Sequence, residues 1–234
     1  SGLQGGAEPS LDLSSLNFGP ADVSFLATLM TSFRLFSAAL NTITLDSTGD
    51  VKKQKKYTIS GLQGGAEPSL DLSSLNFGPA DVSFLATLMT TFTFFSTALA
   101  EVNLSKNKCF DAQSVNAFSD AVLKSNVKTL NFGPKTAFTV SIGVSCEEET
   151  LDYSNQDFGP GELMLISSLV IPFSAAVTEV NLSSNKCFDA ESVKALADVI
   201  PKSKLQTLVI GKDCSVPVVA SDTASLDCSN QYFG

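Results

Sequence analysis

Short triplets of the form apolar–polar–apolar recur along the chain, separated by stretches long enough for a turn and a helix. The clearest case lies in residues 180–210, which open with the triplet Val-Asn-Leu at 180–182. A turn follows, and Asp189 is a good residue to begin a helix. A second triplet at 208–210 completes a strand–turn–helix–strand unit. One apolar helical face is predicted between the two strands, made of Val193, Leu196, Ala197 and Ile200.

Three kinds of unit follow the predicted strands. Type A reads LDLSSLNFGPADVSFLATLM at 11–30, where Pro20 suits the first turn of a helix. Val23, Leu26, Ala27 and Met30 are predicted to form the inward face of that helix. Type B contains the sequence NKCFDA and is the kind of unit just described. Type C replaces the helix with an extended segment, at 57–60 and 138–141, for which we predict strands on the side opposite the main sheet. Strand triplets are predicted at 11–13, 43–45, 70–72, 102–104, 130–132, 151–153, 180–182, 208–210 and 226–228.

One repeat is identical rather than merely similar. Residues 1–31 recur unchanged as residues 60–90. Repeat cores accept many apolar substitutions, so folding alone does not require this identity. It indicates either a recent duplication or a reconstructed sequence.

The type B unit resembles a known family of repeats. Its strand triplet, the asparagine at 107 or 185 and the following helix are similar to the ribonuclease-inhibitor-like class of leucine-rich repeats. The resemblance implies an α/β, right-handed, curved solenoid with a parallel concave sheet, and with helices and some strands on the convex side. Residues 1–234 are then expected to form one solenoid, uncapped at both ends and part of a longer array or assembly. Type A departs from the family pattern, because Leu16, Leu75 and Gln156 replace the asparagine.

Composition excludes several functions. The chain has 15 Lys and Arg against 24 Asp and Glu, a formal net charge of −9, which argues against nucleic-acid binding. It has no histidine, which removes Ser-His-Asp triads and His-ligated zinc. It also lacks a phosphate-binding GxxxxGK[ST] motif and a spaced pair of CxxC motifs. We therefore predict no enzyme, no cofactor and no metal.

Two further features bear on location. No window approaches the ~18 uninterrupted apolar residues of a membrane-spanning helix, so no membrane span is predicted. The low charge and the hydroxyl-rich composition favour an extracellular or cell-surface protein. Of five cysteines, Cys109 and Cys187 occupy inward positions and are predicted to be buried thiols, while the state of Cys146, Cys214 and Cys228 stays open.

The middle residue of each strand triplet is a candidate for binding. Side chains alternate along a strand, so these residues should line the concave face. They could form a groove for a basic or hydroxyl-rich partner, or simply a solvated face, and they lack the Trp, Tyr and Arg typical of binding hot spots. The candidates are Asp12, Asp71, Asn103, Asn131, Asp152, Asn181 and Asp227.

Phenylalanines at the end of each type A helix are the second set of candidates. They could fill extra core, or they could form a row of exposed apolar patches that makes a lateral contact surface. They are Phe33, Phe36, Phe92, Phe94, Phe95 and Phe173.

Two functions remain in competition. The resemblance implies a non-enzymatic scaffold for protein–protein interaction. The identical modules, the uncapped ends and the Phe-rich patches favour a structural subunit of a filament or surface assembly that binds copies of itself. A lysine run at 52–56 would serve such self-association by docking on an acidic patch, or it is a solvated loop.

Overall fold

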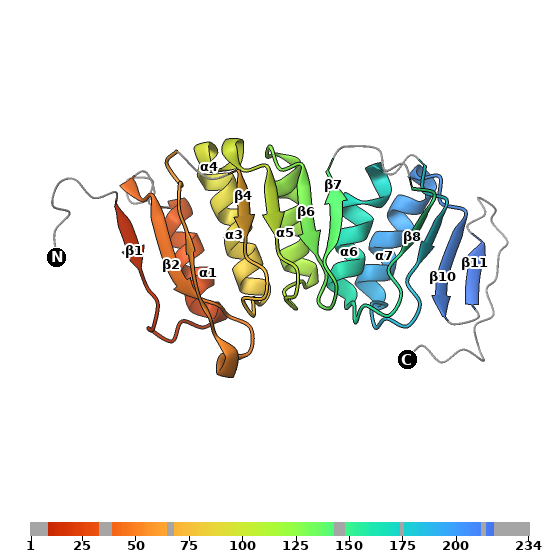
Figure 1. Ribbon diagram of the computed structural model, residues 1–234, viewed down its shortest axis with the longest axis horizontal. Coiled ribbons are helices and arrows are strands. Elements are labelled where there is room, and N and C mark those ends of the chain that lie inside the picture. Colours follow the sequence, from red (N-terminus) through yellow and green to blue (C-terminus); the bar gives the residue numbers. More distant parts are fainter. Residues whose placement is uncertain are drawn as a thin grey trace.

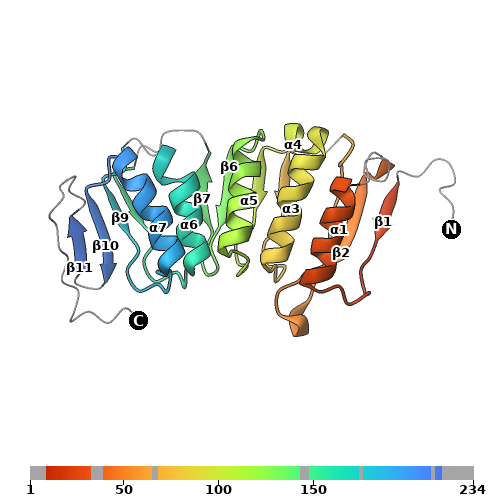
Figure 2. The same cartoon turned by 180° about the vertical axis from the view of Figure 1, so that it is seen from behind.

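Apolar triplets and amphipathic stretches fold into a two-layered, elongated molecule. The computed structural model describes residues 9–32, 39–64, 68–142, 148–173, 176–211 and 214–217. Figure 1 shows the strands in front and the helices in a row behind them, with β1 at one end and β11 at the other. Figure 2 shows the same helices from behind, in the order α1, α3, α5, α6 and α7 along the long axis.

The strands form three separate sheets. The first has the order β1-β2-β3, with β1 Ser10–Asp12, β2 Thr42–Asp46 and β3 Lys56–Ile59. The second has the order β4-β5-β6-β7, with β4 Ser69–Asp71, β5 Glu101–Asn103, β6 Thr129–Phe132 and β7 Phe138–Ser141. The third has the order β11-β10-β9-β8, with β8 Thr150–Asp152, β9 Glu179–Asn181, β10 Thr207–Gly211 and β11 Cys214–Pro217.

This arrangement overturns the predicted solenoid with one parallel concave sheet. The strand triplets of successive units do pair in parallel, as Leu70 with Val102 and Val102 with Leu130. Each type C segment instead turns back as a hairpin and pairs antiparallel with the strand before it, as Leu130 does with Val140. Among the described residues the next strand, β4 or β8, does not pair with the returning strand, so the sheet stops there. The prediction that the type C strands lie on the opposite side is therefore also wrong.

Helices cover one face of all three sheets. The long ones are α1 Pro20–Ser32, α3 Pro79–Thr91, α5 Ala112–Leu123, α6 Pro160–Leu169 and α7 Ala190–Val199. Short helical segments are α4 Thr93–Ala98, η1 Val51–Lys53, η2 Ile171–Phe173 and η3 Ile200–Lys202. Consecutive long helices are in contact, including α5 with α6, although the hairpin β6–β7 lies between them in the sequence. The helix layer is thus continuous where the sheet layer is not.

Each kind of helix begins with its own cap. Type A helices start at a proline, and the backbone N–H of the glycine before it donates to a carboxylate three residues later, as Gly78 to Asp81 at 2.9 Å. In type B helices the carboxylate of Asp189 accepts from the backbone N–H of Ser192 at 2.8 Å, and the Ser192 hydroxyl accepts from the N–H of Asp189 at 2.9 Å. Both arrangements satisfy N–H groups that a helix start leaves without partners. The predicted helix start at Asp189 is confirmed.

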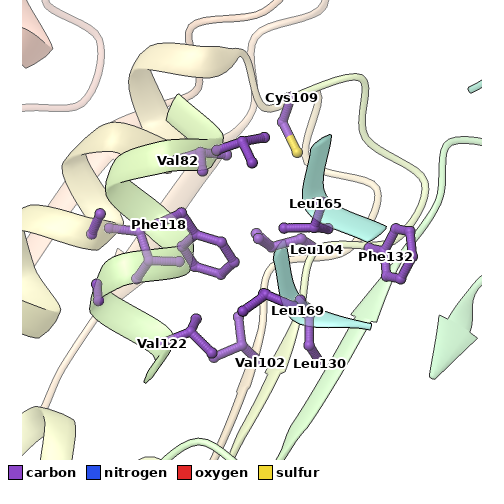
Figure 3. Close-up of a cluster of buried hydrophobic side chains, with 14 of the residues drawn as sticks. Val82, Val102, Leu104, Cys109, Phe118, Val122, Leu130, Phe132, Leu165 and Leu169 are labelled. Atoms are coloured by element: carbon purple, nitrogen blue, oxygen red, sulfur yellow. The ribbon is translucent and has the colours of Figure 1, made fainter. Parts of the chain in front are cut away.

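The core lies between the two layers. Figure 3 shows Phe118 and Val122 of α5 facing Val102 and Leu104 of β5 and its following turn, with Leu165 of α6 beside them. The larger of these side chains are fully buried, with Phe118 and Leu165 both 0% exposed. Cys109 and Cys187 are free thiols at 0% exposure, which confirms the prediction that they are small core residues.

Neighbouring sheets are joined by contacts other than backbone hydrogen bonds between strands. At the β3–β4 boundary the Lys55 ammonium donates to the backbone carbonyl of Ser74, and at β7–β8 the Lys135 ammonium donates to that of Asn155. Ser74 and Asn155 hold equivalent places in their type A turns, and both have positive φ, at 56° and 54°. Turns, lysine side chains and helix packing therefore join one sheet to the next.

Candidate interaction surface

Two copies of one sequence occupy different surroundings in this fold. Helix α1 and helix α3 share the sequence PADVSFLATLMT, yet Phe25 of α1 is 63% exposed and its counterpart Phe84 of α3 is 1% exposed. Asp22 and Leu29 lie on the same side of α1 as Phe25, three and four residues away, and both are more exposed than their α3 counterparts. We call Asp22, Phe25 and Leu29 the α1 face.

In α3 the counterpart of this face is covered by the preceding helix. Asp81 on this face accepts hydrogen bonds from Thr48 and Tyr57 of the preceding unit, whose helix α1 is in contact with α3. The equivalent residues of α6, which are Glu162, Leu165 and Leu169, are 4%, 0% and 1% exposed. Figure 3 places Leu165 and Leu169 in the cluster formed by β5, β6 and α5. The face that α1 leaves open is thus a packing surface at both of its internal counterparts.

Helix α7 shows the same contrast on its opposite side. Val193 and Ala197 of α7, and Ile200 directly after it, correspond to Val115, Ser119 and Val122 of the other type B helix, α5. The α5 residues are 1%, 4% and 1% exposed, whereas Val193 is 46% exposed, Ala197 is exposed and Ile200 is half-buried. We call Val193, Ala197 and Ile200 the α7 face. Of the apolar face predicted for this helix, only Leu196 is buried, at 4%, while Val193 and Ala197 are exposed.

Contacts with α6 bury the α5 side. The hydroxyls of Ser119 and Ser168 lie 2.9 Å apart, across the two helices. A side chain at Gly161 would place its Cβ 2.4 Å from the backbone oxygen of Phe110, so the first turn of α6 approaches the α5 unit at backbone distance. A residue larger than glycine would force the two units apart. In the part of the chain that the structure describes, no helix stands in the same relation to α7.

Burial changes the electrostatics of the three equivalent carboxylates. The Asp22 carboxylate is exposed and accepts from the backbone N–H of Gly19 at 2.9 Å. Asp81 is buried, and desolvation raises its pKa, opposed by four hydrogen bonds that its oxygens accept from Gly78, Thr48 and Tyr57. Burial raises the pKa of Glu162 from 4.5 to about 7, because its hydrogen bond from the N–H of Gly159 only partly offsets desolvation. Packing another unit on this face therefore has a desolvation cost at the ionised carboxylate.

The stability of the chain should depend on the ionisation of Glu162. The unfolded chain loses this proton near pH 4.5 and the folded chain near pH 7, so the contribution of the protonated group is complete below pH 4.5 and is lost as the pH rises through about 7. At about 1.4 kcal/mol per pKa unit, the loss is about 3 kcal/mol.

Substitution Glu162→Gln isolates that contribution. Between about pH 5 and pH 8 we expect the free energy of unfolding of the parent chain to fall by about 2–3 kcal/mol more than that of the variant. Urea unfolding of both proteins across this range measures the difference, and other titrating groups cancel. Parallel pH profiles would contradict the raised pKa.

The predicted concave-face residues fall on separate sheets. The structure brings together Asp71, Asn103 and Asn131 in the second sheet, and Asp152 with Asn181 in the third. Asp12 lies in the first sheet. They do not form one stripe, because the sheets are interrupted. Asp227 lies outside the described residues.

Most of these residues end a strand rather than line a groove. The side-chain oxygens of Asp12, Asp71, Asn103, Asp152 and Asn181 each accept from the backbone N–H two residues later, at 2.9–3.1 Å. Such a hydrogen bond turns the chain sharply after the strand. The pKa of Asp12 is lowered to about 2 by hydrogen bonds from Ser14 and by Lys56. The polar residue in each of these strand triplets is therefore explained by the turn that it stabilises.

Asn131 is the exception among them. Its amide donates to the Glu101 carboxylate at 2.9 Å, and its oxygen accepts from the Thr139 hydroxyl. These contacts join three neighbouring strands of the second sheet across its open face. Asn131 therefore reinforces strand pairing.

The candidate phenylalanines divide between core and undescribed residues. Phe92 and Phe95 are 4% and 2% exposed, so they fill the core and offer no lateral surface. Phe173 is half-buried. Phe33 and Phe36 lie outside the described residues, as does the side chain of Phe94.

The lysine run makes contacts inside the chain. Lys53 pairs with Asp50 at 3.5 Å and Lys56 pairs with Asp12 at 3.1 Å. Lys55 closes the β3–β4 boundary as described above. Surface pairs of this kind contribute little to stability. Three lysines of the run thus already have partners within the chain.

Two other kinds of feature are not found in the described part of the chain. It contains no group of three His, Cys, Asp or Glu residues placed to hold a metal ion. None of its helices is long and apolar enough to cross a membrane. The chain matches no model of a known protein family and no curated protein, so the resemblance to leucine-rich repeats remains a prediction.

Sequence reasoning overlooked the α1 face for a definite reason. Of the inward face predicted for type A helices, Val23, Leu26 and Met30 are buried at 0%, 5% and 0%, and Ala27 is half-buried. Phe25 lies off that stripe, and an aromatic residue outside the core stripe of a helix was the available signal. Local sequence could not reveal which copy would be covered, because the two copies are identical.

Proposed function

We propose that this chain is a non-enzymatic scaffold for protein–protein interaction, and that it binds through the outward faces of its outermost described helices. One observation carries the proposal, which is the contrast between Phe25 at 63% exposure and the identical residue Phe84 at 1%. Isolated surface phenylalanines are common, but this one has a buried counterpart in the same molecule that shows what covers such a face. The matching occupant is an α-helix with small and aliphatic side chains.

The composition supports a binding role over catalysis. A chain without histidine lacks the usual proton-transfer group near neutral pH. The strongly perturbed carboxylates, Asp81 and Glu162, sit under packed helices, where substrate would not reach them. Their perturbation is accounted for by burial between units.

Photo-crosslinking in the cells that produce the protein tests this function. A benzoylphenylalanine at position 25 or 193 should form adducts with protein, whereas the same residue at Asp120, an exposed position on α5, should not. The captured protein must then bind the purified chain, with affinity lowered by Phe25→Asp or Val193→Asp. Equal labelling at all three positions, or labelling that does not survive this purified test, would mean that the faces are simply solvated.

A further inference from the structure

The α1 face and the α7 face are complementary halves of a junction that already exists inside the chain. This inference rests on the proposed function, because it names the partner of the same two surfaces. We propose that the partner is a second copy of this chain, with the α7 face of one copy bound to the α1 face of the next. Copies would then join head to tail.

The internal junction between α5 and α6 supplies the template. There, type B helix α5 and the hairpin β6–β7 are followed by type A helix α6, whose face packs against them. At one end of the described elements stand type B helix α7 and the hairpin β10–β11, paired as β6–β7 is. At the other end stands type A helix α1. Bringing α1 of one copy to α7 of another reproduces the order of the template.

Burial at the hairpin agrees with this match. Phe132 of β6 is 0% exposed beneath the template junction, close to Leu165 of α6. Its counterpart in β10, Ile210, is only half-buried. The rings of Tyr153 and Phe158, which precede α6, lie against Phe132. The hairpin β10–β11 thus has apolar surface to cover at the place where the α6 unit covers β6.

Charge is complementary in the same sense. At the template junction the positive charge of Lys108 acts on Glu162 and favours its ionised form. Lys108 also forms an ion pair with Asp157. Lys186 is the counterpart of Lys108 and Asp22 is the counterpart of Glu162, while the uncharged Asn17 stands at the place of Asp157. A head-to-tail junction would bring Lys186 of one copy toward Asp22 of the next, so the association should weaken as salt is added.

Two internal junctions fix the polarity. In both, the counterpart of the α1 face points to the preceding unit, because Asp81 accepts hydrogen bonds from Thr48 and Tyr57, and the first turn of α6 meets Phe110. At neither junction does this face pack against another copy of the same face. The contact between copies is therefore heterologous, and it can extend to a third copy and beyond, unlike a closed two-fold dimer.

No strand ladder is needed for such a contact. Within the described residues, β3 does not pair with β4 and β7 does not pair with β8, yet the helices across both boundaries pack closely. Helix faces and turn contacts thus suffice to join units in this fold.

Complementation between two blocked variants tests the proposal. Phe25→Asp removes the α1 face and leaves the α7 face, and Val193→Asp does the reverse. In sedimentation velocity we expect the parent chain to form concentration-dependent oligomers, and each variant alone to associate at least about tenfold more weakly. An equimolar mixture of the variants should form a particle of twice the chain mass that does not grow further, because one good junction remains.

Every other result overturns the proposal. A parent chain that stays monomeric, variants that associate like the parent, or a mixture that stays monomeric would each exclude head-to-tail binding. If Val193 were shielded from solvent in a monomer, residues 218–234 of the same chain would be the occupant of the α7 face. The milder changes Phe25→Ser and Val193→Ser, with circular dichroism, check that loss of association is not loss of folding. If cross-linking at 25 and 193 captures another protein while the chain is monomeric, the scaffold function stands and only the second copy fails.

Discussion

Replacing Phe84 with alanine should destabilise the chain by about 3–5 kcal/mol, whereas the same change at Phe25 should cost less than about 1 kcal/mol. Phe84 is 1% exposed in the core and Phe25 is 63% exposed. Removal of a buried phenyl ring loses its transfer free energy and leaves a cavity, while removal of an exposed ring does neither. The two substitutions are a matched pair, since both helices have the same sequence around the changed residue.

Urea unfolding followed by circular dichroism measures both values. The experiment should be run at a concentration where sedimentation shows a monomer, because association would stabilise the parent chain and add to the apparent cost at Phe25. Equal costs in the monomer would mean that Phe25 is covered by its own chain. That result would remove the basis for treating the α1 face as a binding surface.

Asn107→Ala is expected to cost about 3–5 kcal/mol although it removes only a small polar side chain. The oxygen of Asn107 accepts from the backbone N–H groups of Leu75 and Phe77, at 3.0 and 3.1 Å. Its amide donates to the carbonyls of Leu72 and Leu104, at 2.8 and 3.0 Å. Asn107 is 3% exposed, so the substitution would leave several of these backbone groups buried without a partner.

A nearby asparagine provides the control for that substitution. Asn116 lies exposed on α5, and its replacement by alanine should change the free energy of unfolding by less than about 0.5 kcal/mol. Asn185 makes the same set of contacts between the α6 and α7 units as Asn107 makes between the α3 and α5 units, so Asn185→Ala should resemble Asn107→Ala. If Asn107→Ala cost no more than Asn116→Ala, these hydrogen bonds would not hold neighbouring units together.

These asparagines also show how far sequence could predict the fold. The strand triplets, the helix start at Asp189 and the buried side of the type A helices followed from period and capping chemistry alone. The turns of type A units did not, because Leu75 stands where an asparagine was expected. The structure forms that turn with two residues of positive φ, Ser74 and Asn76, and borrows Asn107 from the next unit to satisfy its N–H groups.

Pairing between segments was the weakest part of the prediction. The pattern of Phe138–Ser141 correctly indicates a strand, but a strand pattern does not state its partner or its direction. The short turn from Gly133, which has a φ of 112°, lets the chain reverse and pair with β6, and that reversal ends the sheet. A local choice between hairpin and crossover thus decided the global architecture.

The candidate surface was unpredictable for a different reason. The α1 and α7 faces are exposed because no described helix packs on them, and which helix is covered depends on its place in the fold and not on its local sequence. The concave-face candidates do not form a single stripe, because the strands form three separate sheets and not one. Their polarity reflects strand ends, as Asp71 and Asn181 illustrate.

The interruptions between sheets also affect how the molecule would respond to tension. Within a sheet, neighbouring strands share several backbone hydrogen bonds that break together. At the β3–β4 and β7–β8 boundaries, a pull along the long axis is resisted by packed side chains and a few turn contacts such as those of Lys55 and Lys135. These boundaries are the compliant joints of the structure. The chain would yield there first and extend as three stiff blocks in series rather than as one rod.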